Sequence, residues 1–157
     1  MGWINPTIAL PVLLAILLVS AGIEDARRRE IANWKNAAIA LLAPAWWWAL
    51  GYAAWPDMAA QVALAGIVFA LFCGAFALGQ MGGGDVKLIG ALALWLPLQP
   101  LVWMLMAMSL AGGALTLVML ADHAWKRGSG RIPGPIEVPY GVAIAVAALL
   151  ALPRTGS

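Results

Sequence analysis

Long apolar runs separated by short charged stretches constrain the fold of this chain more than any other feature. The runs cover, approximately, residues 6–23, 37–52, 58–78, 101–121 and 138–152. A bilayer core of about 30 Å is crossed by about 20 helical residues, and within it a helix satisfies its own backbone hydrogen bonds. The 157 residues fit one domain by length. The sequence therefore predicts an all-α membrane protein in a single domain, residues 1–157.

A sixth apolar run, which begins at Val86 and reaches Pro97, is short, and the basic residues decide whether it crosses. Lys and Arg gather on the cytoplasmic side of membrane proteins. If the run crosses, only Arg154 lies outside, and the other basic residues share the cytoplasmic side: Arg27, Arg28, Arg29, Lys35, Lys87, Lys126, Arg127 and Arg131. We therefore predict about six transmembrane helices with both termini outside. The fourth helix is expected to be short, tilted or shielded from lipid.

Composition excludes several classes of protein. The chain is 64% hydrophobic and 10% charged, so an ordinary soluble domain is excluded. Its net charge of +2 comes from short loops, which indicates a bilayer and not a nucleic acid as partner. The lone Cys73 excludes a disulfide framework and a cysteine-based zinc site, and we expect neither a metal nor an organic cofactor. Nine tryptophans, mostly near the ends of runs, are typical of an interfacial aromatic belt.

The most polar break in the apolar pattern is the glycine-rich stretch Gly79–Leu88, which contains Asp85. A carboxylate in or beside a bilayer is costly to place and is a candidate for function. The predicted topology puts Asp85 at the cytoplasmic surface, where Asp25 ends the first apolar run. Packing of helices one and four would bring the two carboxyl groups together. A bland alternative also stands, in which Asp25 is a solvated charge beside arginines and Asp85 merely begins a helix after a glycine turn.

Two carboxyl groups at hydrogen-bonding distance share one proton, because both cannot ionise at low cost. The ionised member can take a proton from water while the protonated member polarises a peptide carbonyl. That chemistry is the chemistry of an aspartyl protease.

The motifs around both aspartates resemble those of the type IV prepilin peptidases, membrane aspartyl proteases of the GxGD class. In particular, the chain resembles the short form found with tight-adherence (Flp-type) pilus systems. Gly82-Gly83-Gly84-Asp85 matches the GxGD signature, and Val86-Lys87-Leu88 continues it. Asp25 is followed by basic residues and Ile31-Ala32-Asn33, where the family usually has Ile-Pro-Asn. Pro139-Tyr140-Gly141 resembles the motif that opens the family's last helix.

The resemblance implies that Asp25 and Asp85 are the catalytic pair of a six-helix protease in the bacterial inner membrane, acting at the cytoplasmic face. Its substrate would be the basic leader of a prepilin or pseudopilin, cut after a glycine just before the hydrophobic segment. Long members of the family carry an insertion with paired cysteines that is linked to N-methylation. With one cysteine and about thirteen residues between helices one and two, this chain is not expected to methylate.

Other residues are assigned weaker roles. Gly82, Gly83 and Gly84 would leave room for a peptide backbone, and Gly141, from the last motif, is also assigned to the active site. Lys87 would anchor the cytoplasmic side or hold Asp85 ionised, Asn33 would brace the loop after Asp25, and Tyr140 would cap the site. Glu24 is expected to be solvated or paired with an arginine. Residues 122–131 are expected to be a polar loop, and Gly112-Gly113 a close-packing surface.

Two other classes of function stay open from the residues alone. The aspartates could form the proton or cation site of a small ion-coupled transporter, although they lie at one face and no inverted repeat is evident. The chain could also be a non-catalytic subunit of a pilus or secretion apparatus, in which case the aspartates are dispensable. A homo-oligomer is compatible with each class.

Overall fold

The computed structural model describes residues 5–128 and 140–152. Within these residues the chain is helical and has no strand, so the prediction of an all-α membrane protein is confirmed. The elements are α1 (Pro6–Arg28), α2 (Asn33–Ala49), the short π-helix η1 (Ala54–Met58), α3 (Ala59–Ala77), α4 (Gly83–Ala93), α5 (Leu98–Gly128) and α6 (Tyr140–Ala151).

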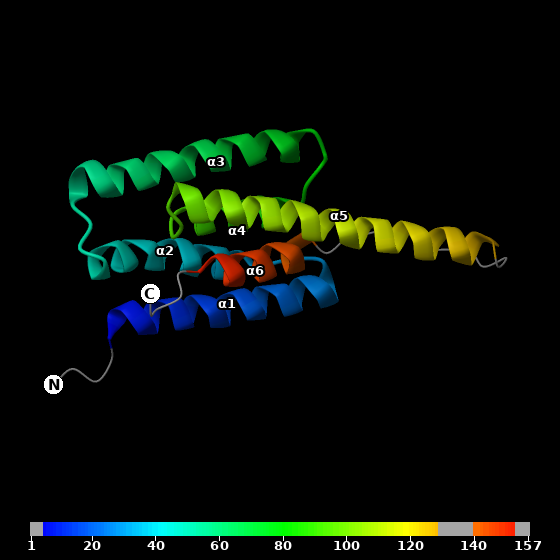
Figure 1. Cartoon of the computed structure of the whole chain (residues 1–157), viewed down its shortest axis with the longest axis horizontal. Coiled ribbons are helices and arrows are strands. Elements are labelled where there is room, and N and C mark those ends of the chain that lie inside the picture. Colours follow the sequence, from blue (N-terminus) through cyan, green and yellow to red (C-terminus); the bar gives the residue numbers. More distant parts are fainter. Residues whose placement is uncertain (1–4, 129–139, 153–157) are drawn as a thin grey trace.

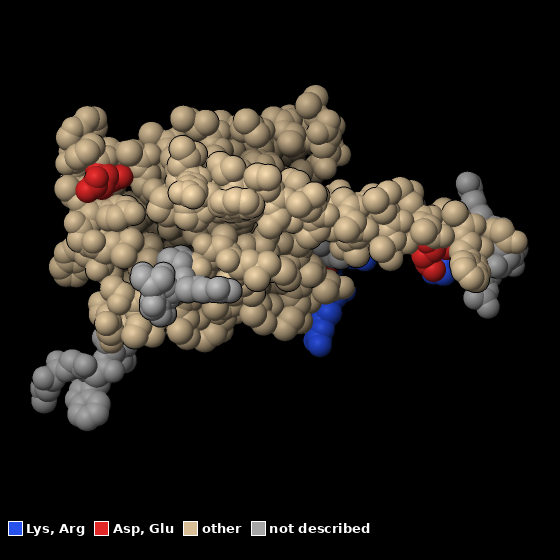
Figure 2. Space-filling view, in the orientation of Figure 1, with Lys and Arg blue, Asp and Glu red and all other residues tan. Residues whose placement is uncertain are grey.

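Successive α-helices run in opposite directions (Figure 1). As a result, one end of the bundle holds the starts of α2, α4 and α6 together with the ends of α1 and α3. The second half of α5 extends beyond this end. Figure 2 shows a face with almost no charged side chains between the two ends of the bundle, as a surface in contact with lipid requires.

Three helical stretches are long and apolar enough to cross a membrane: Pro6–Arg28, Ala54–Ala77 and Leu98–Lys126. The helix α6 is apolar but shorter, α2 has 17 residues and α4 has 11. Within the described residues, six α-helices therefore form where six apolar runs were expected, while the number of crossings stays a prediction.

Two predicted loops are shorter in the structure. Helices α1 and α2 are joined by residues 29–32 alone, since α1 continues to Arg28 and ends at Arg29 in the left-handed conformation. The polar loop predicted for residues 122–131 is wrong up to Gly128, because α5 continues to that residue. An ion pair one helical turn apart, between Lys126 and Asp122, supports the extension. Residues 129–131 lie outside the described residues.

Helix α4 forms the centre of the bundle. Eight of its residues are buried, and it contacts α2, α3 and α6. The main neighbours of α1 are instead α6 and α2, each of which also contacts α4. The prediction that α1 packs against α4 is therefore wrong. Instead, α2 and α6 each contact both α1 and α4 and connect the two helices.

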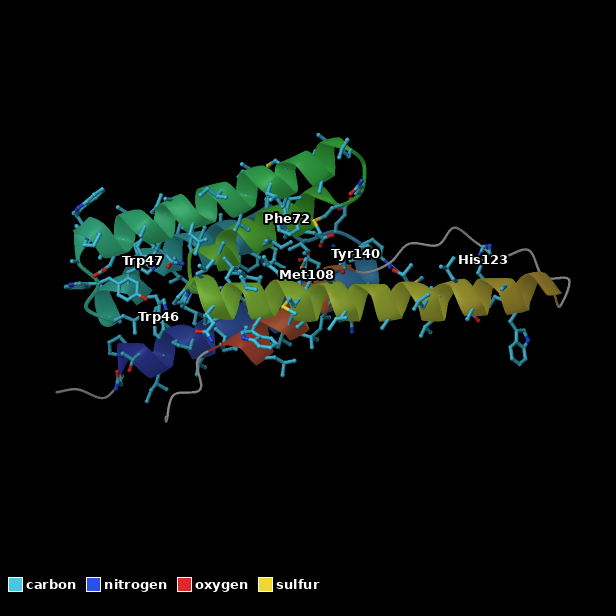
Figure 3. All side chains as sticks on the ribbon, turned by 45° about the horizontal axis from the view of Figure 1, so that its top comes forward. Trp46, Trp47, Phe72, Met108, His123 and Tyr140 are labelled. Atoms are coloured by element: carbon cyan, nitrogen blue, oxygen red, sulfur yellow. The ribbon has the colours of Figure 1, made fainter. Side chains whose placement is uncertain are left out.

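The tryptophans do not all belong to an interfacial belt. Trp46, Trp47 and Trp95 are buried, and the rings of Trp46 and Trp95 stack with centroids 5.8 Å apart. Trp47 Nε1 donates to the carbonyl oxygen of Leu94 at 2.7 Å, and Trp95 Nε1 donates to that of Ile39 at 2.8 Å. These residues hold the end of α4 against α2, at the end of the bundle away from the extension of α5 (Figure 3). In the part of the chain that the structure describes, five exposed tryptophans fit the belt: Trp34, Trp48, Trp55, Trp103 and Trp125.

Candidate active site

Asp25 lies near the end of α1 and faces the first turn of α6. The N–H of Val142 donates to Asp25 Oδ2 at 3.2 Å, and the N–H of Gly141 lies within hydrogen-bonding reach. These N–H groups belong to a helix start, where they have no partner within the helix and carry the positive end of the helix dipole. Asp25 as a whole residue is only 5% exposed. The sequence analysis assigned Tyr140 and Gly141 to the site, but it did not indicate that N–H groups of this helix start would bind the Asp25 carboxyl group.

Gly141 is required by that contact. A Cβ atom at this position would lie 2.7 Å from Asp25 Cγ and 2.9 Å from Ile31 Cδ1. Any side chain would therefore displace the Asp25 carboxyl group from α6. Steric contact with Asp25 thus explains why this position of the last motif is a glycine. Gly141 lies beside Asp25, in the site to which the sequence analysis assigned it.

Asp85 is the third residue of α4, after Gly82 as N-cap. The carboxyl group turns back toward the start of its own helix, where the N–H of Gly82 is within reach and a Cβ at Gly82 would lie 3.2 Å from Asp85 Oδ2. Asp85 does lie in the first turn of a helix after a glycine turn, as the non-catalytic interpretation expected. This position is also compatible with a catalytic role. The next two glycines face protein: Gly83 faces the ring of Phe76, and Gly84 faces Ile31.

The two aspartates share one polar pocket of about 300 Å³. They come from different helices, and their charges interact across it. The remaining lining comes from the α1–α2 connection, the start of α2 and the glycine turn: Arg29, Glu30, Ile31, Asn33, Gly82, Gly83 and Gly84. The structure therefore unites Asp25 and Asp85, with Asn33 and the three glycines beside them.

Two residues assigned to the site lie elsewhere. Lys87 does not line the pocket, and its Nζ donates to Asn33 Oδ1 at 2.8 Å. The ring of Tyr140 packs on α5, where a Cβ at Gly112 would lie 2.8 Å from Tyr140 Cε1 (Figure 3). Tyr140 therefore does not cap the pocket, whereas the close packing expected at Gly112 is confirmed. Gly113 has no such neighbour within 4 Å.

Glu24 pairs with a lysine, where an arginine or solvent was expected. Its Oε2 lies 2.8 Å from Lys35 Nζ and accepts the N–H of Ala32 at 3.2 Å. Lys35 Nζ also donates to the carbonyl oxygen of Ser20 at 3.1 Å. This half-buried network ties the start of α2 to the end of α1 that carries Asp25.

Asn36 makes the corresponding link to α4, and sequence reasoning missed it. Its Nδ2 donates to the carbonyl oxygen of Gly84, the residue before Asp85, at 3.3 Å. The first turn of α2 therefore reaches α1 through Lys35 and α4 through Asn36. Two polar residues just ahead of an apolar run were the available signal, but their partners depend on the tertiary arrangement.

The arrangement suits acid–base chemistry on a bond held in a polar pocket. Two carboxyl groups on separate helices can divide the tasks of proton acceptor and proton donor. Among residues 5–128 and 140–152, no group of three or more His, Cys, Asp or Glu side chains could hold a metal ion. The fold and the pocket thus define an α-helical membrane protein with a site suited to hydrolysis.

Comparison with models of known families identifies the family. Residues 12–117 match the type IV leader peptidase family, and this range covers about two thirds of the chain. The chain belongs to that family. The match includes Asp25 and the glycine stretch through Asp85, and it ends before α6. A search among curated proteins and a search among solved structures found no match.

Proposed function

We propose that Asp25 and Asp85 are the catalytic pair of an aspartic endopeptidase that removes prepilin leaders. The observation that carries the proposal is the polar pocket that holds two carboxyl groups, Asp85 in the first turn of α4 and Asp25 facing the first turn of α6. Membership of the type IV leader peptidase family supplies the class of reaction.

The pair acts through one shared proton, because two carboxylates in a small pocket repel each other. The ionised carboxyl takes a proton from water, and the water oxygen attacks the carbonyl carbon of the scissile bond. The protonated carboxyl donates its hydrogen to the carbonyl oxygen. The first carboxyl then passes its proton to the amide nitrogen, and the C–N bond breaks to give a carboxylic acid and an amine. The carbonyl proton returns to the pair.

We assign the ionised role to Asp25 and the protonated role to Asp85. Asp25 has two N–H groups of α6 in reach and lies near Arg29, and both features stabilise a negative charge. Asp85 has one such donor, Gly82, and faces the negative charge of Asp25.

The substrate is the basic leader of a Flp-type prepilin or pseudopilin, cut after its terminal glycine at the cytoplasmic face of the inner membrane. A basic leader is attracted to the negative charges of Asp25 and Glu30 in the pocket, which outnumber the positive charge of Arg29. Successive α-helices run in opposite directions, so the starts of α2 and α4 lie at the same end of the bundle as the pocket. Lys35 and Lys87 at these helix starts support a cytoplasmic pocket. N-methylation is not assigned to this chain, since residues 29–32 alone join α1 to α2.

The first turn of α2 positions the pair. Lys35 holds the end of α1, and Asn36 holds the start of α4, so one rigid turn sets the separation between the two aspartates. The substitution Lys35→Met would therefore lower the turnover rate more than it changes the Michaelis constant, and Lys35→Arg would restore part of the rate.

Co-expression with a Flp-type prepilin tests the function, with leader removal followed on a gel. Wild-type protein should cleave, and Asp25→Ala and Asp85→Ala should each abolish cleavage while accumulating in the membrane normally. Asp122→Asn is the matched control, because Asp122 is an exposed carboxylate on the extension of α5. Full cleavage by either alanine variant would exclude the pair and favour a non-catalytic role.

A further inference from the structure

A groove of about 520 Å³ lies beside the active-site pocket, between α2, α3 and α4. Its lining falls within residues 33–40, 62–69 and 87–94, so each helix contributes about two turns, or roughly 10 Å. The lining is apolar except at one end, where Asn33, Asn36 and Lys87 lie.

The polar end of this groove adjoins the active-site pocket. Asn33 lines both cavities, and its Oδ1 accepts the hydrogen bond from Lys87. Asn36 lines the groove and holds the carbonyl oxygen of Gly84, while its Oδ1 is buried and has no hydrogen-bond partner in the described part of the chain. A polymer chain that leaves the pocket past Asn33 would therefore enter the groove directly.

Small residues keep the groove open. Gly66 lies midway along the α3 side, and a Cβ there would meet no atom within 4 Å. Ala37, Ala40 and Ala91 face it from the other two helices. A side chain at Gly66 would therefore begin in open space at the side of the groove.

Two other apolar grooves show what a lipid-facing surface of this protein looks like. One, of about 540 Å³, runs along α1 from Val12 to Ile23, and another, of about 550 Å³, lies between α1 and α2 near Pro6 and Trp48. They match the first groove in size and apolar character, but neither shares a residue with the active-site pocket. Contact with lipid would explain the apolar lining of all three grooves. It does not explain why the groove between α2, α3 and α4 shares Asn33 with the active-site pocket.

We propose that the groove between α2, α3 and α4 binds the apolar segment of the substrate that follows the scissile bond. This inference rests on the proposed function. The basic leader would lie in the polar pocket, the scissile bond would pass between the aspartates, and about two turns of apolar helix would pack between α2 and α3. Binding energy from that remote segment would orient the bond that is cut.

Two synthetic peptides with the same basic leader and glycine test the proposal on the detergent-solubilised full chain. One continues with ten Leu and Ala residues, and the other with ten Ser and Gly residues. Wild type should prefer the apolar peptide in kcat/KM. Gly66→Phe should reduce that preference about tenfold or more, because the ring fills the groove. Gly74→Phe is the matched control. A Cβ atom at Gly74 would also meet no atom within 4 Å, but Gly74 lies about two turns further along α3 and does not line the groove. An unchanged preference in Gly66→Phe would overturn the proposal.

Photo-crosslinking gives a second measurement that does not need turnover. A benzophenone amino acid at position 66, in an Asp85→Asn background, should capture the apolar half of the peptide, and the same group at position 74 should not. Capture of phospholipid alone at saturating peptide would mean that the groove holds lipid, and it would overturn the proposal. If wild type cleaves neither of the two peptides, the proposed function is overturned. If it cleaves both with a preference that Gly66→Phe leaves unchanged, only the groove proposal fails.

Discussion

Helices α3 and α4 are neighbours in sequence and in space, and both are apolar, yet they meet different surroundings. Helix α3 has 19 residues, of which only Gln61 and Ala65 are buried. Helix α4 has 11 residues, of which eight are buried. A helix that faces lipid has to match the thickness of the bilayer, whereas a helix enclosed by protein does not. Enclosure also lets α4 begin with a glycine turn and a carboxylate, since protein groups and not lipid surround them.

The largest expected effect is the difference in cleavage rate between variants of the two acidic residues near the starts of α3 and α4. Asp57 precedes α3, is exposed and accepts the N–H of Ala53 at 3.0 Å, whereas Asp85 is enclosed in the pocket. Asp85→Asn should lower the cleavage rate at least about 10³-fold, because it removes one member of the pair. Asp57→Asn should leave the rate within about twofold, as expected of an exposed surface position. Equal losses in the two variants would show that helix-start acids act only through stability.

A leucine on each helix tests enclosure directly. Leu92 on α4 is fully buried, and Leu71 on α3 is 67% exposed. Leu92→Ala should lower the free energy of unfolding by about 2 kcal/mol, near the low end for buried leucines because the reference state keeps leucine in hydrocarbon. Leu71→Ala should change it by less than about 0.5 kcal/mol. Reversible unfolding by SDS in mixed micelles measures both, and a larger loss for Leu71→Ala would reverse the comparison.

The glycine turn between the helices allows a smaller and more local test. A Cβ at Gly84 would lie 3.5 Å from Ile31 Cβ, which is ordinary contact, so Gly84→Ala should be tolerated. The two extra methyl groups of Gly84→Val would press on Ile31 and move Asp85 within the pocket. We expect kcat/KM to fall about tenfold, a change of about 1.4 kcal/mol, without loss of folded protein. A fully active Gly84→Val variant would mean that the glycine serves only the turn.

The smallest expected effect concerns the one polar side chain buried in α3. Gln61 Nε2 donates to the carbonyl oxygens of Ala93 and Leu96 at 2.7 and 2.8 Å, and so holds the end of α4. Gln61→Leu should lower the free energy of unfolding by about 1 kcal/mol, the range of hydrogen bonds between membrane helices. The exposed Gln99 provides the control variant Gln99→Leu. If the two variants have the same free energy of unfolding in SDS, the hydrogen bonds of Gln61 do not stabilise the contact, and apolar packing alone holds α3 to α4.

Much of this architecture could be predicted because apolar runs and polar breaks leave clear marks on a sequence. The six helices, the shortness of α4 and the common end of Asp25 and Asp85 followed from run lengths and from the positions of basic residues. Errors arose where charged residues continue a helix, as in residues 122–128 at the end of α5. The partner of Glu24 and the place of Tyr140 also differed from expectation, because each depends on how a neighbouring helix packs.

The sequence by itself determined that the chain is an α-helical membrane protein with two carboxylates at one end of the bundle. Only the tertiary structure decided that α4 is enclosed and α3 is not, that Asp25 meets the start of α6, and that Lys35 and Asn36 bridge to the helices of both aspartates. The physical reason is the solvent. In water a buried helix face differs from an exposed one in polarity, but lipid is as apolar as a protein core, so the sequence does not reveal which face packs and against which neighbour.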